Sequence, residues 1–279
     1  MVLKNKFTDT LVYANIFISF AGLSQVILTL TLFSIPINWQ NVSYVLFVFL
    51  STFLQYNMQR GYNFLEKHPD NERNIWLFKN KKVLLIFLGI SLISLLFLCN
   101  WLSWTSIGIM IAAELISSFY FMKPLQLRRF GFVKPFIISL IWVVSCAIVP
   151  FIENNLINSR ALLFCLAQFF LITSLCVLFD IKDKIIDSSE GVKTYANTFG
   201  TKITKLIAFI LTVFYFIIML LVFNTSSYIL LNSLYFLIVT IAILITNDEK
   251  DSFYYFLFVD GLLIIQLLIT AGCLNLFGT

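Results

Sequence analysis

The sequence predicts an all-α, polytopic membrane protein with nine transmembrane helices. Hydrophobic residues make up 60% of the chain and charged residues only 12%, whereas a soluble domain carries about 25% charged residues. Apolar runs of about 20 residues, long enough to cross a bilayer as a helix, recur along the whole chain. The basic residues are confined to particular loops, as is typical of membrane proteins. These observations exclude a soluble protein, and the net charge of +5 does not indicate a nucleic-acid partner.

Nine apolar segments are the expected spans. They cover residues 12–34, 41–57, 83–99, 103–121, 133–150, 161–179, 204–223, 228–246 and 253–274. The polar break at 100–104 separates the third span from the fourth, and its tryptophans suit a membrane interface. Little of the chain remains for a soluble domain, so we expect residues 1–279 to form a single transmembrane domain.

The lysines and arginines predict the orientation of these spans. All of them except Arg160 fall in the N-terminal segment or in connections on one side of the bilayer. Because basic loops stay in the cytoplasm, we expect a cytoplasmic N-terminus and an external C-terminus. The apolar run after Lys4 and Lys6 is too long for a signal peptide, so we expect it to be retained as the first span. No organelle-targeting segment is evident, which favours a prokaryotic cell (inner) membrane.

The cysteines and the single histidine show no recognisable binding or catalytic pattern. The five cysteines lie in or at the ends of apolar runs and form no Cys-x-x-Cys pair, so we expect neither disulfides nor metal binding from them. The single histidine, His68, lies in a charged loop and is expected to be solvated.

An acidic stretch follows the sixth span. Asp180, Asp183 and Asp187 are three and four residues apart, so they share one face of a helix. Like charges on one face repel unless a cation neutralises them, and Mg²⁺ prefers carboxylates together with phosphate oxygens. Further along, Gly191, Lys193 and Thr194 can present hydrogen-bond donors to a phosphate. The stretch is therefore either a metal and phosphate site or a solvated acidic turn.

A polar cluster lies at the inner end of the second span. Asn57, Arg60 and Asn63 fall within one third of a helical circumference. They can line the mouth of a polar cavity. Alternatively, Arg60 only extends its charge to the lipid headgroups.

A basic cluster follows the fourth span. It contains Tyr120, Lys123, Arg128, Arg129 and Lys134. Such a cluster attracts anionic lipid, at about 1 kcal/mol per basic residue, and it can equally bind a diphosphate.

Two acidic residues, Glu114 and Asp260, lie inside expected spans. A charged residue in the bilayer costs roughly 3 kcal/mol on insertion scales, so each is a candidate functional residue facing a cavity. A structural hydrogen bond between helices is the alternative for both.

Together these features resemble the UbiA superfamily of intramembrane prenyltransferases. The matching residues are Asp180-x-x-Asp183-x-x-x-Asp187 after the sixth span, Gly191-x-Lys193-Thr194, Gly200, and the region of Tyr120 and Lys123. The resemblance implies nine helices around a central cavity that holds Mg²⁺ and an isoprenyl diphosphate. In such a site the diphosphate leaves, and a lipophilic acceptor attacks the allylic cation.

The resemblance also implies roles for individual residues. The three aspartates would bind the metal and carry catalysis. Substrate would be bound by Asn57, Arg60, Tyr120, Lys123, Arg128 and Lys193. Phenylalanine and tyrosine side chains would shield the cation from water, and a side opening to the bilayer would admit the isoprenoid tail.

One part of the family pattern is missing. The family's first motif, Asn-Asp-x-x-Asp-x-x-x-Asp at the end of the second helix, keeps only Asn57 here. Met58, Gly61 and Leu65 stand at the aspartate positions. We hypothesise that Arg60 contacts phosphate directly, because a guanidinium matches phosphate geometry with two parallel hydrogen bonds.

The predicted function is Mg²⁺-dependent transfer of an isoprenyl group from an isoprenyl diphosphate to an aromatic or other lipophilic acceptor within the membrane. A catalytically degenerate binding or scaffold protein of UbiA-like fold is the first alternative. A small-molecule transporter is the second, although discontinuous helices with matching Gly or Pro breaks are not evident.

Overall fold

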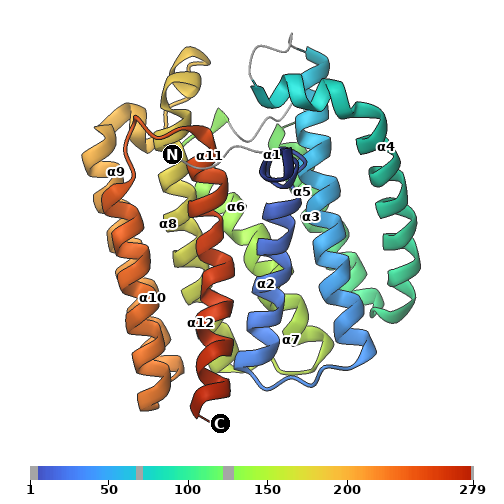
Figure 1. The fold of residues 1–279 in the computed structure, drawn as a ribbon. Coiled ribbons are helices and arrows are strands. Elements are labelled where there is room, and N and C mark those ends of the chain that lie inside the picture. The colour runs from blue at the N-terminus through green and yellow to red at the C-terminus, as the bar shows by residue number, and fades with distance from the viewer. Residues whose placement is uncertain (1–5, 67–71, 122–128, 278–279) are drawn as a thin grey trace.

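The computed structural model describes residues 6–66, 72–121 and 129–277, and the regular elements in these ranges are helices (Figure 1). In chain order they are α1 (Lys6–Tyr13), α2 (Ile16–Leu32), α3 (Trp39–Glu66), α4 (Glu72–Leu98), α5 (Trp104–Phe121), α6 (Lys134–Val143), α7 (Val149–Glu153), α8 (Ser159–Ser189), α9 (Tyr195–Val222), α10 (Ser226–Ile245), α11 (Ser252–Tyr254) and α12 (Gly261–Phe277). A short 3₁₀ turn at Cys99–Trp101 extends α4.

Two of the long rods contain a π-helical turn. Val144–Ile148 joins α6 to α7, and Tyr255–Val259 joins α11 to α12. A π turn accommodates one residue more than an α turn and therefore changes which side chains face inward on either side of it. Both turns contribute residues to the cavity described below.

The chain is an integral, multi-pass membrane protein. Six segments are long and apolar enough to cross a bilayer, and the bent pair α1–α2 makes a seventh if it is one span. The six segments are 72–101, 134–153, 159–189, 195–222, 226–245 and 252–272. Each of the nine expected spans overlaps a helix or a pair of helices joined by a π turn. However, α3 and α5 are not among the segments that are long and apolar enough to cross a bilayer. The total of nine spans therefore stays a prediction.

The first expected span is broken in the structure. α1 and α2 meet at 62°, and Asn15 between them takes a left-handed conformation with φ 61°. Asparagine tolerates this conformation better than most residues. The apolar run at 12–34 carries no Gly or Pro at this point, so its pattern alone did not indicate the bend.

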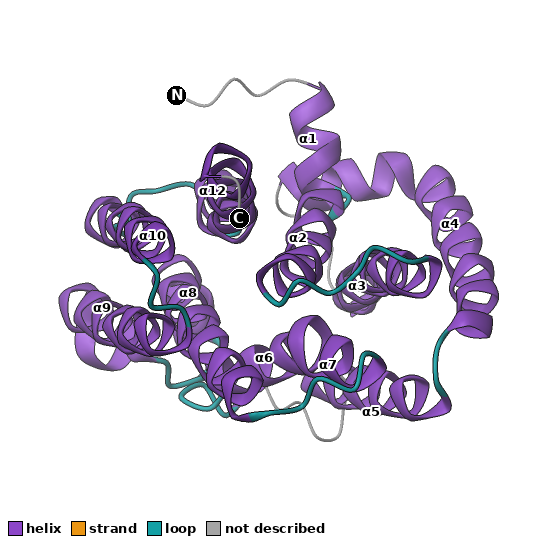
Figure 2. Ribbon diagram, turned by 90° about the horizontal axis from the view of Figure 1, so that it is seen from below, coloured by secondary structure: helices purple, strands orange, loops and turns teal. Residues whose placement is uncertain are grey.

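Viewed along the rods, the helices form a ring (Figure 2). α12 packs against both α2 and α10, and α8 packs between α6 and α9, so the two ends of the chain meet and close the bundle. Small polar residues allow close packing of α8 on α9: Ser174 Oγ donates to the carbonyl of Ala208 at 2.7 Å and lies 2.9 Å from Thr212 Oγ1. Such contacts are common between helices in membranes.

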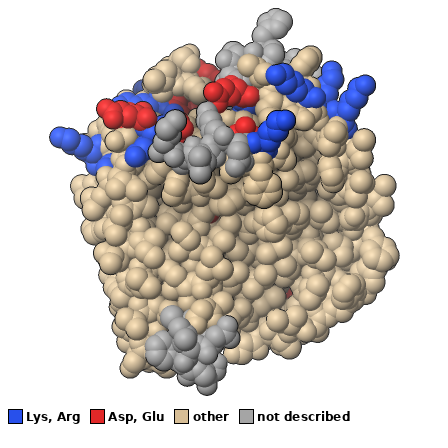
Figure 3. Space-filling model, viewed as in Figure 1, with Lys and Arg blue, Asp and Glu red and all other residues tan. Residues whose placement is uncertain are grey.

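α8 carries the acidic stretch beyond the apolar layer. Its 31 residues make a rod of about 46 Å, whereas the hydrocarbon layer is about 30 Å thick. The helix begins at Asn158, whose side chain caps Ala161 N at 2.9 Å, and the chain reverses at Gly191 with φ 71°. α9 then starts at a capping box formed by Thr194 and Asn197. In Figure 3 the visible charged side chains gather at this end of the bundle.

Candidate functional site

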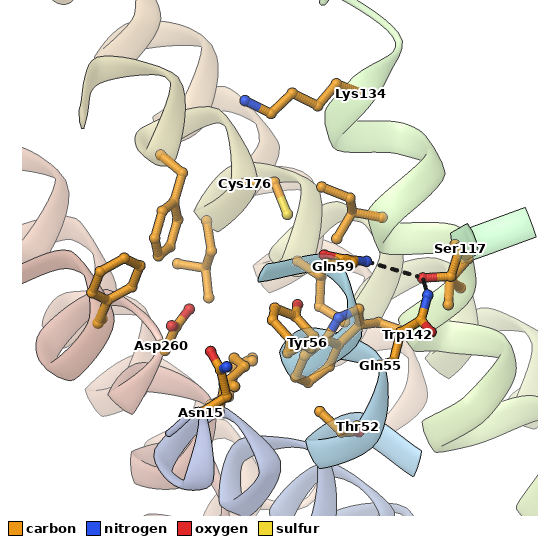
Figure 4. Close-up of a pocket in the computed structure, with 18 of the residues that line it drawn as sticks. Asn15, Thr52, Gln55, Tyr56, Gln59, Ser117, Lys134, Trp142, Cys176 and Asp260 are labelled. Atoms are coloured by element: carbon orange, nitrogen blue, oxygen red, sulfur yellow. Dashed lines mark hydrogen bonds between the residues drawn. The ribbon is translucent and has the colours of Figure 1, made fainter. Parts of the chain in front are cut away.

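A cavity of about 410 Å³ lies inside the bundle at this charged end. Side chains from α1–α6, α8, the π turns and α12 line it (Figure 4). The start of α4 together with α6, α8 and the residues around Asp260 contributes a charged wall, and α3 and α5 contribute a mostly uncharged, polar wall. Apolar residues, among them Ile138, Ile172 and Leu175, complete the lining.

The three aspartates of α8 converge on Lys134, the first residue of α6. The ammonium nitrogen of Lys134 lies 3.4 Å from Asp180 Oδ1, 3.7 Å from Asp183 Oδ2 and 3.5 Å from Asp187 Oδ2. Asp183 and Asp187 line the cavity, whereas Asp180 is fully buried behind them. The expected common face is present, and it points at a cation supplied by the chain itself.

This set of carboxylates suits a hard divalent cation. Neither side-chain oxygen of Asp180 accepts a hydrogen bond from the described residues, and oxygen acceptors of this kind are the preferred ligands of Mg²⁺. Among the described residues, however, no three acidic, histidine or cysteine side chains are arranged closely enough to hold a metal ion. The carboxylates instead surround the ammonium of Lys134. A bound metal ion would either share the negative charge of the three aspartates with Lys134 or displace the ammonium of Lys134.

Two further cations lie close to one aromatic ring. Arg73 Cζ lies 4.8 Å and Lys182 Nζ 4.7 Å from the centre of the Phe256 ring. Lys182 also forms an ion pair with Asp183 at 2.8 Å. All four side chains line the cavity, and Asp260 from the same wall interacts electrostatically with both cations. The charged wall thus holds acidic and basic groups in close alternation.

Asn57 lies behind the cavity wall. Its Nδ2 donates to the carbonyls of Ala14 and Phe53 at 2.9 and 2.8 Å, and its Oδ1 accepts from Asn15 Nδ2 at 3.0 Å. It is buried and does not line the cavity. The structure therefore shows Asn57 bracing the bend between α1 and α2, and its predicted role in binding substrate stays a prediction.

Of the other predicted substrate-binding residues, the structure describes the side chain of Lys193 only. Lys193 is exposed and does not line the cavity. The backbones of Arg60 and Tyr120 lie in α3 and α5, but their side chains lie outside the described part of the structure, as do Lys123 and Arg128 altogether. Their roles stay predictions.

The uncharged wall centres on Ser117. Gln55 Nε2 donates to Ser117 Oγ at 2.7 Å, and Gln59 Nε2 donates to the same oxygen at 3.4 Å (Figure 4). Gln55 and Ser117 are both buried. Glu114, one turn before Ser117, lines the cavity as expected for an intramembrane acid. Polar groups held in this way inside an apolar bundle can bind the polar part of a lipid-soluble molecule.

Several of these residues were not singled out as site residues from the sequence. Gln55 and Gln59 are four residues apart in an otherwise apolar segment, which is the signal that places both on one helical face. Asn15 and Arg73 carry no comparable local signal. Lys134 was recognised only as part of a basic cluster.

Solved structures with a similar fold include UbiA homologues and a phosphate synthase. A UbiA homologue from Archaeoglobus fulgidus bound to GPP and Mg²⁺ matches with a TM-score of 0.67 and 13% identity, over 96% of this chain and 99% of that one. The homologue from the same organism bound to Cd²⁺ matches with a TM-score of 0.64 and 15% identity, over 98% and 100%. A digeranylgeranylglyceryl phosphate synthase matches with a TM-score of 0.59 and 17% identity, over 96% of both chains.

At these identities the structural matches show the fold alone. No match was found among curated protein sequences. The family model of the UbiA prenyltransferases, by contrast, matches residues 77–259, which is more than half of the chain. This chain therefore belongs to the UbiA prenyltransferase family.

Proposed function

We propose that the protein transfers an isoprenyl group from an isoprenyl diphosphate to a lipophilic acceptor within the membrane, with Mg²⁺ at the acidic stretch. The observation that carries this proposal is the convergence of Asp180, Asp183 and Asp187 at the charged wall of an intramembrane cavity. Structural relatives bound to GPP or DMAPP together with Mg²⁺ support the class of substrate.

The charged wall would hold the diphosphate. Mg²⁺, when bound, would neutralise charge on the leaving diphosphate. Asp183 and Asp187 line the cavity and would be the metal ligands nearest to the substrate, and Asp180, which lies 3.4 Å from Lys134, would orient its ammonium. The ammonium of Lys134 would stabilise the charge that develops as the carbon–oxygen bond breaks and its electron pair moves to the diphosphate.

The middle of the cavity would hold the allylic group. Tyr56, Trp142 and Phe179 line it, and aromatic faces stabilise a positive charge while excluding water. The acceptor would lie against Gln55 and Ser117 on the uncharged wall, where it forms the new bond to carbon and releases a proton. This arrangement separates the leaving group from the acceptor.

The remaining elements of the proposal concern the membrane. We infer nine spans, one transmembrane domain over residues 1–279, and a cytoplasmic N-terminus in a prokaryotic inner membrane. The one-sided distribution of lysine and arginine supports this orientation. The charged end of the cavity would then open towards water-soluble Mg²⁺ and diphosphate in the cytoplasm.

The test compares isolated membranes that contain the wild type, Asp183→Asn or Asp248→Asn. Labelled isoprenyl diphosphates of several lengths are supplied with a panel of phenolic and quinol acceptors, in Mg²⁺ or EDTA. We expect Mg²⁺-dependent product from the wild type and at least a hundredfold less from Asp183→Asn. Asp248 is an exposed aspartate paired with Lys184 at 3.6 Å, so Asp248→Asn is the matched control. Binding of diphosphate without any product across the panel would contradict the proposal.

A non-catalytic binding protein is the second candidate. It is favoured by one specific observation: Asn57, the surviving residue of the first motif, is fully engaged in hydrogen bonds that hold the helix bend. Such a protein would bind an isoprenyl diphosphate without releasing pyrophosphate. Measurement of bound and free label in the same experiment distinguishes the two.

A further inference from the structure

We propose that Arg73 and Lys182 bind a phosphate group directly, as a metal-independent half-site beside the three aspartates. The inference rests on the proposed function for the nature of the ligand, a diphosphate ester. It goes beyond that function because it assigns the role of the missing first acidic motif to two basic residues outside that motif.

A chain of hydrogen bonds connects the remnant of the first motif to Arg73. Asn57 Oδ1 accepts from Asn15 Nδ2 at 3.0 Å, and Asn15 Oδ1 in turn accepts from the guanidinium of Arg73. The same guanidinium donates to the carbonyl of Tyr13 at 3.5 Å. The surviving asparagine thus does not reach the cavity itself, but through Asn15 it positions an arginine that does.

The orientation of Arg73 is fixed from a second side by Phe256. The guanidinium lies over the ring at 4.8 Å, and Lys182 lies 4.7 Å from the same ring centre. Arg73 is only 8% exposed, so its position is set by packing as well as by hydrogen bonds. Both cations line the cavity that also contains Asp183 and Asp187.

The acidic and basic side chains of the charged wall would bind phosphate in complementary ways. An ionised carboxylate needs a cation between itself and a phosphate oxygen, whereas a guanidinium or an ammonium can contact that oxygen directly. In this chain Met58, Gly61 and Leu65 offer no oxygen ligands where the family has aspartates. A diphosphate at this wall would therefore need metal where it meets the aspartates and none where it meets Arg73 and Lys182.

Asp260 provides the counter-charge when no anion is bound. It lines the cavity and interacts electrostatically with both Lys182 and Arg73. Lys182 also pairs with Asp183 at 2.8 Å, so the two cations are neutralised in the absence of an anion. An incoming phosphate would replace these carboxylates as their partner. This arrangement accounts for two cations in a bundle interior, where an unpaired charge is costly.

The test measures binding of inorganic pyrophosphate and of GPP to the detergent-purified full chain, in EDTA and in Mg²⁺. In EDTA the wild type is expected to bind pyrophosphate, and Arg73→Gln and Lys182→Gln are each expected to bind it at least tenfold more weakly. In Mg²⁺ both variants should retain part of their affinity through the aspartate wall. Asp183→Asn should lose the Mg²⁺-dependent gain, while its binding in EDTA should not weaken, because the substitution releases Lys182 from its ion pair.

Arg160→Gln is the matched control. Arg160 also lies over aromatic rings, at 4.7 Å from the centre of Phe223, and donates to a backbone carbonyl. It does not line the cavity, so its replacement should leave pyrophosphate binding unchanged. Lys182→Gln keeps the inference testable if Arg73→Gln fails to fold, because Lys182 makes no contact with the α1–α2 bend in the described hydrogen bonds.

Three results have defined meanings. Wild-type binding in EDTA that is unaffected by both glutamine variants would overturn the inference while leaving the proposed function intact. Metal-independent binding lost in both variants, but with no transfer to any acceptor, would support the inference and contradict the proposed function. No binding of pyrophosphate or GPP by the wild type in either condition would overturn both.

Discussion

The ammonium of Lys134 lies 3.4 Å from Oδ1 of Asp180, a carboxylate that is fully buried and accepts no hydrogen bond from the described residues. Among the described residues, Lys134 thus provides the positive charge nearest to the buried carboxylate of Asp180. The pair joins the start of α6 to α8, and the same ammonium also contacts Asp183 and Asp187. A single lysine therefore links the stability of the bundle to the state of the acidic site.

Replacing Lys134 should make the protein depend on metal for stability. Lys134→Met leaves three carboxylates facing one another, and loss of one partner from a buried ion pair costs about 3 kcal/mol. We expect a lower unfolding temperature in EDTA and substantial recovery in Mg²⁺, measured by thermal unfolding in detergent. Lys184→Met, at a surface ion pair, is the control. Equal stability of Lys134→Met and the wild type in EDTA would refute this role.

Replacing Gln55 should weaken acceptor binding selectively. Gln55→Leu removes the 2.7 Å hydrogen bond to Ser117 and makes this part of the uncharged wall apolar. If the acceptor binds there, its KM should rise about tenfold, the effect of losing roughly one hydrogen bond. The KM for the isoprenyl diphosphate should stay the same in the same steady-state assay. An equal rise in both KM values would mean that the cavity as a whole has changed shape.

Asn57 should prove structural in unfolding experiments. Asn57→Ala removes three buried hydrogen bonds, and each polar group that is left without a partner costs about 1–3 kcal/mol. The unfolding temperature should fall clearly, and proteolysis should become faster at the α1–α2 bend. Asn80→Ala removes only one local bond to the carbonyl of Trp76 and should have little effect. Comparable stability of the two variants would argue against the bracing role.

Gly131 should not tolerate a side chain. A Cβ at this position would lie 2.2 Å from the carbonyl oxygen of Lys193, whereas one at Gly108 would meet nothing within 4 Å. Gly131→Ala should therefore separate the start of α6 from the loop after α8 and lower the unfolding temperature. Gly108→Ala should leave it unchanged or slightly raise it, because alanine favours the helix.

The sequence predicted the parts of the fold and site that depend on local pattern. The apolar runs located the helices, and the spacing of Asp180, Asp183 and Asp187 placed them on one face. The same reasoning did not identify the centre of the site, because Lys134 and Asp187 meet across 53 residues. It also misplaced Asn57, whose main partner, Asn15, lies 42 residues away. Contacts of this kind arise only when helices pack, and no local periodicity encodes them.

The two π turns make two short segments of this protein tolerant of losing one residue. Removing one residue from Tyr255–Val259 would allow a regular α-helix to form, with its backbone hydrogen bonds intact. The helices on either side would keep their present orientation, because the π turn is where the extra residue is accommodated. Deleting one residue from a regular turn of α12 would instead rotate the rest of that helix by about 100°. A library of single-codon deletions should therefore yield folded, active variants at Tyr255–Val259 more often than in α12.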